Sequence, residues 1–336
     1  MKQMLYLIGG IIILMGVLLV LYFSGPVISI KSLSPLLPEV SEDLAELEEM
    51  VKDKEARYSN KLKPGNESKI IWADSVPSKT KYSIVYLHGW SASSEEGAPL
   101  HTETARRYHC NLYLPRLEGH GFKGINGMRN LTAVKLMDSA KEAVAIASKL
   151  GDKVIVIATS TGASLALYLA GENPCIAGII MYSPNIELYA SAAKLLGGPW
   201  GLQFARMING DYYEFQVNAV RRKFWTHRYN VEALPQLQVL LNYTMVPKTF
   251  EKVKQPVFMG YYFKNEEEQD KVVSVAAMLR MFDQLGTPES AKHKKAFAEA
   301  GHHVLASHTI SKDISSVTKE TFYFLENHMG LSPHKQ

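Results

Sequence analysis

Short apolar runs alternate with longer amphipathic segments along most of this chain of 336 residues. The apolar runs are rich in β-branched residues, which is typical of strands buried on both faces of a parallel sheet. The segments between them repeat apolar residues at helical spacing. This alternation predicts an α/β fold, with a mostly parallel, doubly wound sheet that helices cover on both faces. We expect strands at 82–87, 111–114, 154–157, 176–182, 256–263 and 295–299, and helices at 41–58, 131–150, 163–170, 272–285 and 314–328.

The alternation stops between about residues 185 and 247, where no clear buried-strand pattern occurs. We interpret this segment as a mainly helical insertion that forms a cap over the carboxyl edge of the sheet. Three parts of the chain follow from these patterns. They are a membrane anchor at 1–25, a linker with an amphipathic helix at 26–60, and the α/β domain with its cap at 61–332.

The first of these parts has the composition of a membrane-spanning helix. Residues 4–23 are uncharged and almost wholly apolar, about long enough to cross a hydrocarbon core. The alternative is a cleaved signal peptide, which would have a shorter apolar region and small residues around the cut. We therefore expect an uncleaved anchor. Lys2 and Lys31 balance each other across it, so only the terminal amine of Met1 favours placing the α/β domain on the extracytoplasmic side.

Composition narrows the classes of partner and cofactor. With 46% hydrophobic and 21% charged residues, the chain is globular, and its length suits one large α/β domain with appendages. The net charge of +4 is mild and no Lys/Arg tract occurs, so we expect no nucleic-acid partner. Cys110 and Cys175 lie in apolar surroundings without metal-ligand spacing. We expect core thiols, and a single bridge between the two remains the alternative.

The turn Ala158-Thr159-Ser160-Thr161-Gly162 carries the main chemical signal. It follows a predicted buried strand directly and opens a predicted helix, an arrangement that exposes a serine at the edge of a parallel sheet for nucleophilic attack. Small residues are needed two places on either side because the turn crowds the strand against the helix, and Ala158 stands where glycine is usual. The alternative is a serine that only caps the helix. The strand before and the helix after favour the nucleophile.

A serine hydroxyl needs a base within hydrogen-bond reach and a carboxylate that orients this base. Asp270 follows the strand expected at 256–263, and capping the next helix is its alternative role. Glu266–Glu268 are its nearest rivals, although three adjacent glutamates are more typical of a solvated loop. His302 and His303 both follow the last predicted strand, where the base belongs. We favour His303 as the base, with His302 as the alternative.

These residues, together with Leu87-His88-Gly89-Trp90 and the loop 114–121, resemble the serine α/β-hydrolases. The similarity is greatest to the monoacylglycerol-lipase and carboxylesterase type and covers about residues 70–329. It implies a capped sheet, an acyl-enzyme intermediate on Ser160, and no cofactor or metal. It also implies an oxyanion hole formed by the backbone N–H groups of Trp90 and Thr161. His88 and His120 are expected to be structural.

The expected function is therefore that of a serine hydrolase, esterase- or lipase-like, that cleaves carboxylic esters such as monoacylglycerols. A membrane anchor and an aromatic-rich cap suit an acyl-chain substrate, although the same aromatic residues can serve as the core of the cap. They are Trp200, Phe204, Phe224 and Trp225. An acyltransferase or peptidase of the same fold is the alternative, and a non-catalytic binding module on this scaffold is a third reading.

Overall fold

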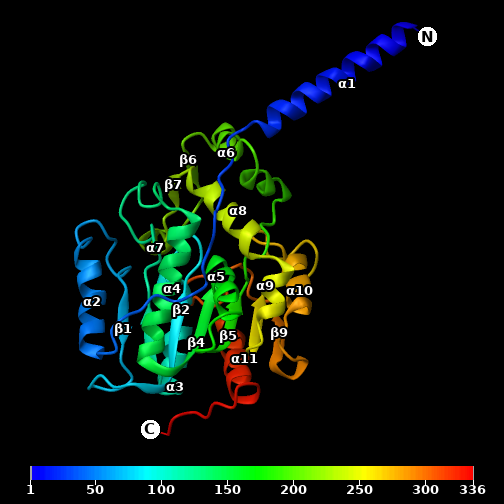
Figure 1. The fold of residues 1–336 in the computed structure, drawn as a ribbon. Helices are drawn as coiled ribbons and strands as arrows, with labels where there is room; N and C mark the ends of the chain where they lie inside the picture. The colour runs from blue at the N-terminus through cyan, green and yellow to red at the C-terminus, as the bar shows by residue number, and fades with distance from the viewer. Residues whose placement is uncertain (1, 336) are drawn as a thin grey trace.

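A seven-stranded sheet lies at the centre of the structure, a computed structural model that describes residues 2–335, without the side chains of Lys2 and Leu5 (Figure 1). The terminal amine of Met1, on which the expected orientation of the membrane anchor depends, lies outside the described residues. The strand order is β1-β3-β2-β4-β5-β8-β9, and every neighbouring pair is parallel except β1 with β3. The predicted fold class is confirmed. The strands are β1 (Lys69–Ile71), β2 (Thr80–Leu87), β3 (Asn111–Leu114), β4 (Gly151–Thr159), β5 (Ile176–Tyr182), β8 (Val257–Tyr261) and β9 (Lys292–Ala296).

Helices bury both faces of the sheet, which is why its central strands are continuous apolar runs. Successive residues of a strand point to opposite faces, so Val85 and Leu87 join one hydrophobic cluster whereas Ile84 and Tyr86 join the other. The first cluster includes side chains of α2 (Leu44–Ala56), α4 (Ala133–Leu150), α5 (Thr161–Ala170) and α10 (Val275–Gln284). The second includes side chains of α3 (Leu100–Arg107) and α11 (Ile314–Asn327).

Several predicted elements begin or end at other residues than expected. The last strand is β9, at Lys292–Ala296 rather than 295–299, because this sheet-edge strand has no buried apolar run that could mark it. The helix expected at 41–58 begins only at Leu44, since the carboxylate of Asp43 accepts the first free amides and caps it. The hydroxyl of Ser41 donates to the carboxylate of Glu46 instead of capping the helix.

The segment between β5 and β8 is mainly helical, as expected, and lies beyond the carboxyl edge of the sheet (Figure 1). It also contains a two-stranded antiparallel ribbon, β6 with β7, that the sequence pattern did not reveal because each strand has only three residues. Its elements are the 3₁₀ helix η2 (Ser191–Gly197), α6 (Gly201–Asn209), β6 (Tyr212–Glu214), α7 (Ala219–Phe224), β7 (Arg228–Asn230), α8 (Ala233–Thr244) and α9 (Pro247–Lys252).

The amino-terminal helix α1 (Lys2–Phe23) projects away from this body and points outward beside α6 (Figure 1). Its stretch Tyr6–Phe23 has a mean hydropathy of 2.6 and no buried residue, so length and composition allow it to cross a membrane. A signal sequence near an N-terminus can meet the same criteria of length and composition. The end of α1 contacts the cap, because the indole Nε1 of Trp200 donates to the carbonyls of Leu21 and Tyr22, at 3.1 Å each.

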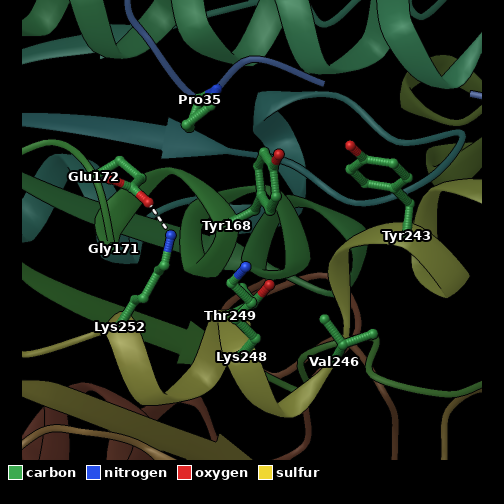
Figure 2. A pocket seen from close by; sticks show the side chains of 9 residues that line it. All are labelled: Pro35, Tyr168, Gly171, Glu172, Tyr243, Val246, Lys248, Thr249 and Lys252. Atoms are coloured by element: carbon green, nitrogen blue, oxygen red, sulfur yellow. Dashed lines mark hydrogen bonds and ion pairs between the residues drawn. The ribbon is translucent and has the colours of Figure 1, made fainter. Parts of the chain in front are cut away.

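The linker after α1 is fixed to the body rather than free. The hydroxyl of Tyr168 donates to the carbonyl of Leu33 at 2.5 Å, and the amide of Asn173 donates to the carbonyl of Pro35 at 2.9 Å. Figure 2 shows Pro35 facing Tyr168 across a pocket of about 280 Å³ that α5, α8 and α9 line. This pocket contains none of the residues predicted for chemistry, so we assign it to linker docking.

Helix α2 is docked by a buried ion pair. The guanidinium of Arg116 donates from Nε to Glu55 Oε2 at 2.7 Å and from Nη2 to Oε1 at 3.1 Å, and both side chains are buried. The hydroxyl of Ser68 donates to the same carboxylate at 3.0 Å. The guanidinium also lies over the rings of Tyr58 and Phe122. The pair therefore holds α2 against the loop that follows β3.

We predict that Glu55→Ala lowers the free energy of unfolding by about 3–5 kcal/mol, because Arg116 would remain buried without its partner. Glu49→Ala on the exposed side of the same helix is the matched control and should change it by less than about 0.5 kcal/mol. Chemical denaturation followed by tryptophan fluorescence measures both. Equal stability of the two variants would contradict the role given to the ion pair.

Candidate active site

Ser160 occupies a strained turn between β4 and α5. Its backbone has φ +54° and ψ −121°, a conformation that residues with a side chain adopt only when the surroundings impose it. Its N–H donates to the carbonyl of Tyr182 at 2.9 Å, and its carbonyl accepts from the amide of Asn185 at 3.1 Å. A Cβ at Gly162 would lie 2.0 Å from the carbonyl oxygen of Leu87, so only glycine fits there. The tight approach of α5 to β2 thus presents the serine at the sheet edge.

The structure brings Asp270 and His303 together. The Nδ1 atom of His303 lies 2.6 Å from Oδ2 of Asp270, and both side chains are buried. The other carboxylate oxygen of Asp270 accepts from the amides of Val272 and Val273, at 2.9 and 3.1 Å. Asp270 does not cap the following helix, since Ser274 does that. The contact leaves Nε2 as the free nitrogen of His303.

Electrostatics reinforce this pair. Burial opposes ionisation of Asp270, but the charge and hydrogen bond of His303, with two backbone amides, outweigh it and hold the pKa of Asp270 below its ordinary value. Burial likewise disfavours the imidazolium of His303. The Asp270 carboxylate outweighs that penalty and raises the pKa of His303 above its ordinary value. The Asp270 carboxylate therefore stabilises the imidazolium that forms when His303 takes up a proton.

His302 has a different environment. Its Nδ1 atom accepts from the amide of Val304 at 2.9 Å, and it makes no hydrogen bond to Asp270 within the described residues. Burial, and then the nearby charge of His303, lower the pKa of His302 to about 4. The rival acids Glu266–Glu268 are exposed, as a solvated loop requires. Of the two histidines left open by the sequence, His303 is the one that contacts the acid.

The two amides expected to form an oxyanion hole are free donors. Over residues 2–335, the N–H groups of Trp90 and Thr161 make no hydrogen bond, and Thr161 is the first residue of α5, where the helix offers no acceptor. The side chain of Trp90 is fixed, since its indole donates to the hydroxyl of Tyr229 at 3.0 Å. Two unpaired amides and a helix N-terminus therefore lie beside Ser160.

His88 and His120 support this loop. The Nε2 atom of His88 accepts from the amide of Leu117 at 3.1 Å, and that of His120 accepts from the amide of Ser91 at 2.9 Å. The rings meet edge to face with centroids 4.9 Å apart. Burial lowers the pKa of His88 well below its ordinary value and that of His120 to about 4, so both stay neutral.

The hydroxyl of Ser160 and the imidazole of His303 are not hydrogen-bonded to each other among the described residues. Both lie near the Gly89 loop: Cβ of Ser160 lies against Gly89, and the charge of His303 acts on Glu96, whose carboxylate accepts from the Gly89 amide. Val304, next to His303, forms one buried cluster with Ala92 and with Trp225 of the cap. Hydrogen bonds of this kind are often long before a substrate binds and shorten in the complex.

Among residues 2–335, no group of three or more His, Cys, Asp or Glu could hold a metal ion. Cys110 and Cys175 are free thiols.

Sequence reasoning missed two charged residues close to this site. Glu96 is buried and accepts from the amide of Gly89, the residue before Trp90. Arg221 of α7 lies near enough for its charge to act on Glu96, His302 and His303. In the sequence Glu96 is one of two adjacent glutamates, and Arg221 is one of three adjacent basic residues. Both patterns are typical of solvated surface, so only the folded chain distinguishes these side chains from their neighbours.

Histidine NMR tests the electrostatic assignment. We predict that His303 titrates above its ordinary pKa and that His302 titrates near 4. In Asp270→Asn the pKa of His303 should fall, because the charge that favours the imidazolium is gone. A pKa of His303 below that of His302, or one that Asp270→Asn leaves unchanged, would contradict the pairing of His303 with Asp270.

Comparison with known proteins points in one direction. The sequence model of the alpha/beta hydrolase family matches residues 84–309, more than half of the chain. The thermostable monoacylglycerol lipase of Bacillus sp. (strain H-257) is 29% identical over 115 residues, which is 34% of this chain and 45% of that enzyme. The matched stretch thus spans less than half the length of this relative.

Solved structures share the fold at low sequence identity. A chain of LipS and LipT, two metagenome-derived lipolytic enzymes, has a TM-score of 0.64 at 18% identity, over 80% of this chain and 100% of its own. The monoacylglycerol lipase of Paleococcus ferrophilus has a TM-score of 0.58 at 15% identity, over 78% and 98%. A soluble variant of the Saccharomyces cerevisiae monoglyceride lipase has a TM-score of 0.60 at 12% identity, over 78% and 91%.

The resemblance inferred from the motifs is thereby confirmed at the level of the family. The sheet order, the capped carboxyl edge and the family match agree with one another. The chain belongs to the alpha/beta hydrolase family.

Proposed function

We propose that the protein is a serine esterase of the lipase type, with Ser160 as nucleophile, His303 as base and Asp270 as the residue that orients the base. The observation that carries the proposal is the buried 2.6 Å contact between Asp270 and His303, at the same edge of the sheet as the strained turn of Ser160. Backbone strain and buried charged groups both lower the stability of a fold. Proteins retain them mainly at functional sites, where the geometry and the shifted pKa values serve catalysis.

The reaction follows from the free atoms of these groups. Nε2 of His303 accepts the proton of the Ser160 hydroxyl as Oγ bonds to the acyl carbon of an ester. The resulting oxyanion lies against the amides of Trp90 and Thr161, each worth on the order of 3 kcal/mol to kcat. His303 then protonates the leaving alcohol, and an acyl-enzyme on Ser160 remains. Water adds to it by the same route in reverse and releases the acid.

Ester turnover tests the assignment of roles. We predict that Ser160→Ala lowers kcat on a p-nitrophenyl ester by roughly 10⁶-fold and that Asp270→Asn lowers it by about 10⁴-fold. Ser148→Ala, a helix serine outside the site, is the control and should match the wild type. Product analysis with added alcohol separates hydrolysis from acyl transfer. Undiminished turnover by folded Ser160→Ala would exclude this mechanism.

We further propose that α1 is an uncleaved anchor, with the catalytic domain on the extracytoplasmic side, and that residues 1–25, 26–60 and 61–332 act as anchor, linker and hydrolase domain. The contact of Trp200 with the last turn of α1 supports this, because a membrane around α1 would adjoin the cap (Figure 1). Helix α6, which lies near the end of α1 (Figure 1), exposes Met207 (75%) and Ile208 (72%). An acyl ester drawn from the membrane, with monoacylglycerol as the first to test, suits this arrangement.

Vesicle assays test the lipid substrate. We predict that Met207→Ser combined with Ile208→Ser lowers hydrolysis of monoacylglycerol in vesicles several-fold, since both substitutions remove an apolar side chain that lipid would bury. Turnover of soluble p-nitrophenyl acetate should not change. Tyr323→Ser on α11, at the opposite end of the molecule, is the control. Equal vesicle activity of the double variant and the control would argue against cap contact with lipid.

A further inference from the structure

A buried carboxylate lies behind the loop that carries Trp90. Glu96, in the 3₁₀ helix η1 (Ser94–Gly97), is 2% exposed. Its Oε2 accepts from the amide of Gly89 at 2.6 Å and from the hydroxyl of Tyr86 at 3.4 Å. Within residues 2–335, no Lys, Arg or His nitrogen comes within 4.0 Å of it. Burying a carboxyl group without an ion-pair partner lowers the stability of the fold, so we ask what function the side chain of Glu96 serves.

Only Gly89 separates this carboxylate from the nucleophile. A Cβ at Gly89 would lie 2.9 Å from Glu96 Oε1, 3.1 Å from Oε2 and 3.1 Å from Cβ of Ser160. Both side chains therefore lie against the same small volume, which a side chain at residue 89 would need. The missing side chain of glycine allows the acid and the serine to approach the loop together.

A second connection runs through Tyr86 to the strand that carries Ser160. The hydroxyl of Tyr86 lies 2.9 Å from Oγ1 of Thr159, the residue before Ser160. Tyr86 belongs to β2 and Thr159 to β4, which are adjacent parallel strands. Glu96 is thus bonded to the peptide before Trp90 and, through Tyr86, linked to the strand that ends at Ser160. These are the two segments that supply the proposed oxyanion donors.

Three parts of the fold place titratable groups around Glu96. The hydroxyl of Tyr86 faces it from β2, Arg221 acts on it from α7, and His303 acts on it from the loop after β9. Burial raises the pKa of Glu96 to about 7, against the opposing effects of the Gly89 amide, His303 and Arg221. In return, Glu96 adds to Asp270 in raising the pKa of His303, whereas Arg221 lowers it.

We propose that Glu96 is a positioning residue of the active site, whose carboxylate fixes the Trp90 amide relative to Ser160 and the Thr161 amide. This inference rests on the proposed function and specifies a part of that site. Its consequence is a transition-state effect. The oxyanion forms only during reaction, so a displaced Trp90 amide weakens a bond that the bound ester does not yet make.

Two substitutions separate the geometry of Glu96 from its charge. Glu96→Ala removes the acceptor for the Gly89 amide, and we expect kcat to fall roughly 10- to 100-fold, while KM changes less than about twofold. Glu96→Gln keeps a carbonyl oxygen at the same reach, so kcat should stay within about threefold of the wild type. Glu95→Ala, the partly exposed neighbour on the same 3₁₀ helix, is the matched control.

A pH profile supplies a readout that a merely structural residue would not move. The acid limb of kcat/KM reports the proton on His303, which must leave before the histidine can act as a base. The pKa of Glu96 is raised to about 7, so its negative charge favours this proton in the upper part of the limb and is lost as pH falls below about 7. Glu96→Gln removes that contribution, so the pKa of His303 falls. The acid limb should therefore move to lower pH in Glu96→Gln and stay in place in Glu95→Ala.

The outcomes distinguish this inference from the function on which it rests. Wild-type protein without Ser160-dependent ester turnover would remove the proposed function and this inference with it. Where the wild type is active, a Glu96→Ala variant with a native unfolding transition and wild-type kcat overturns the role of Glu96 alone. If Glu96→Ala fails to fold, Glu96→Leu, which keeps the volume but also lacks the acceptor, decides, and wild-type kcat in that folded variant overturns the role as well.

Discussion

The close approach of α5 to the end of β2 is the constraint on which the site depends. It is made at Gly162, where any side chain would collide with the carbonyl of Leu87. This contact forces Ser160 into its left-handed turn and brings the first amide of α5 to the loop that carries Trp90. Because neighbouring strands are parallel, the loops that bear Asp270 and His303 emerge at the same edge of the sheet.

Sequence reasoning succeeded where burial on both sides left an unambiguous pattern. The strands β4 and β5 are continuous apolar runs, so both the sheet and the position of Ser160 could be inferred from them. The edge strand β9 is rich in lysine and has no such run, so its position was wrong by three residues. The strands β6 and β7 have three residues each, too few to show an alternation of apolar and polar residues in the sequence.

The chemistry-bearing residues divide in the same way. Asp270 could be located because a carboxylate after that strand is expected from the chain order. The sequence favoured His303 over His302 but left both open, since both follow one strand. The conformation of the loop, including Gly301 at φ +65°, decides which ring reaches Asp270. Glu96 was missed because its burial is a property of the fold and not of its neighbours in sequence.

The central claim is that Ser160 is the residue that bonds to the acyl group. Peptide mass spectrometry after treatment of the folded, active protein with a fluorophosphonate tests it most directly. The account predicts a single adduct on the peptide that contains Ser160, formed in parallel with loss of ester turnover. Inactivation with the adduct on another residue, or full turnover by protein already modified at Ser160, would contradict it.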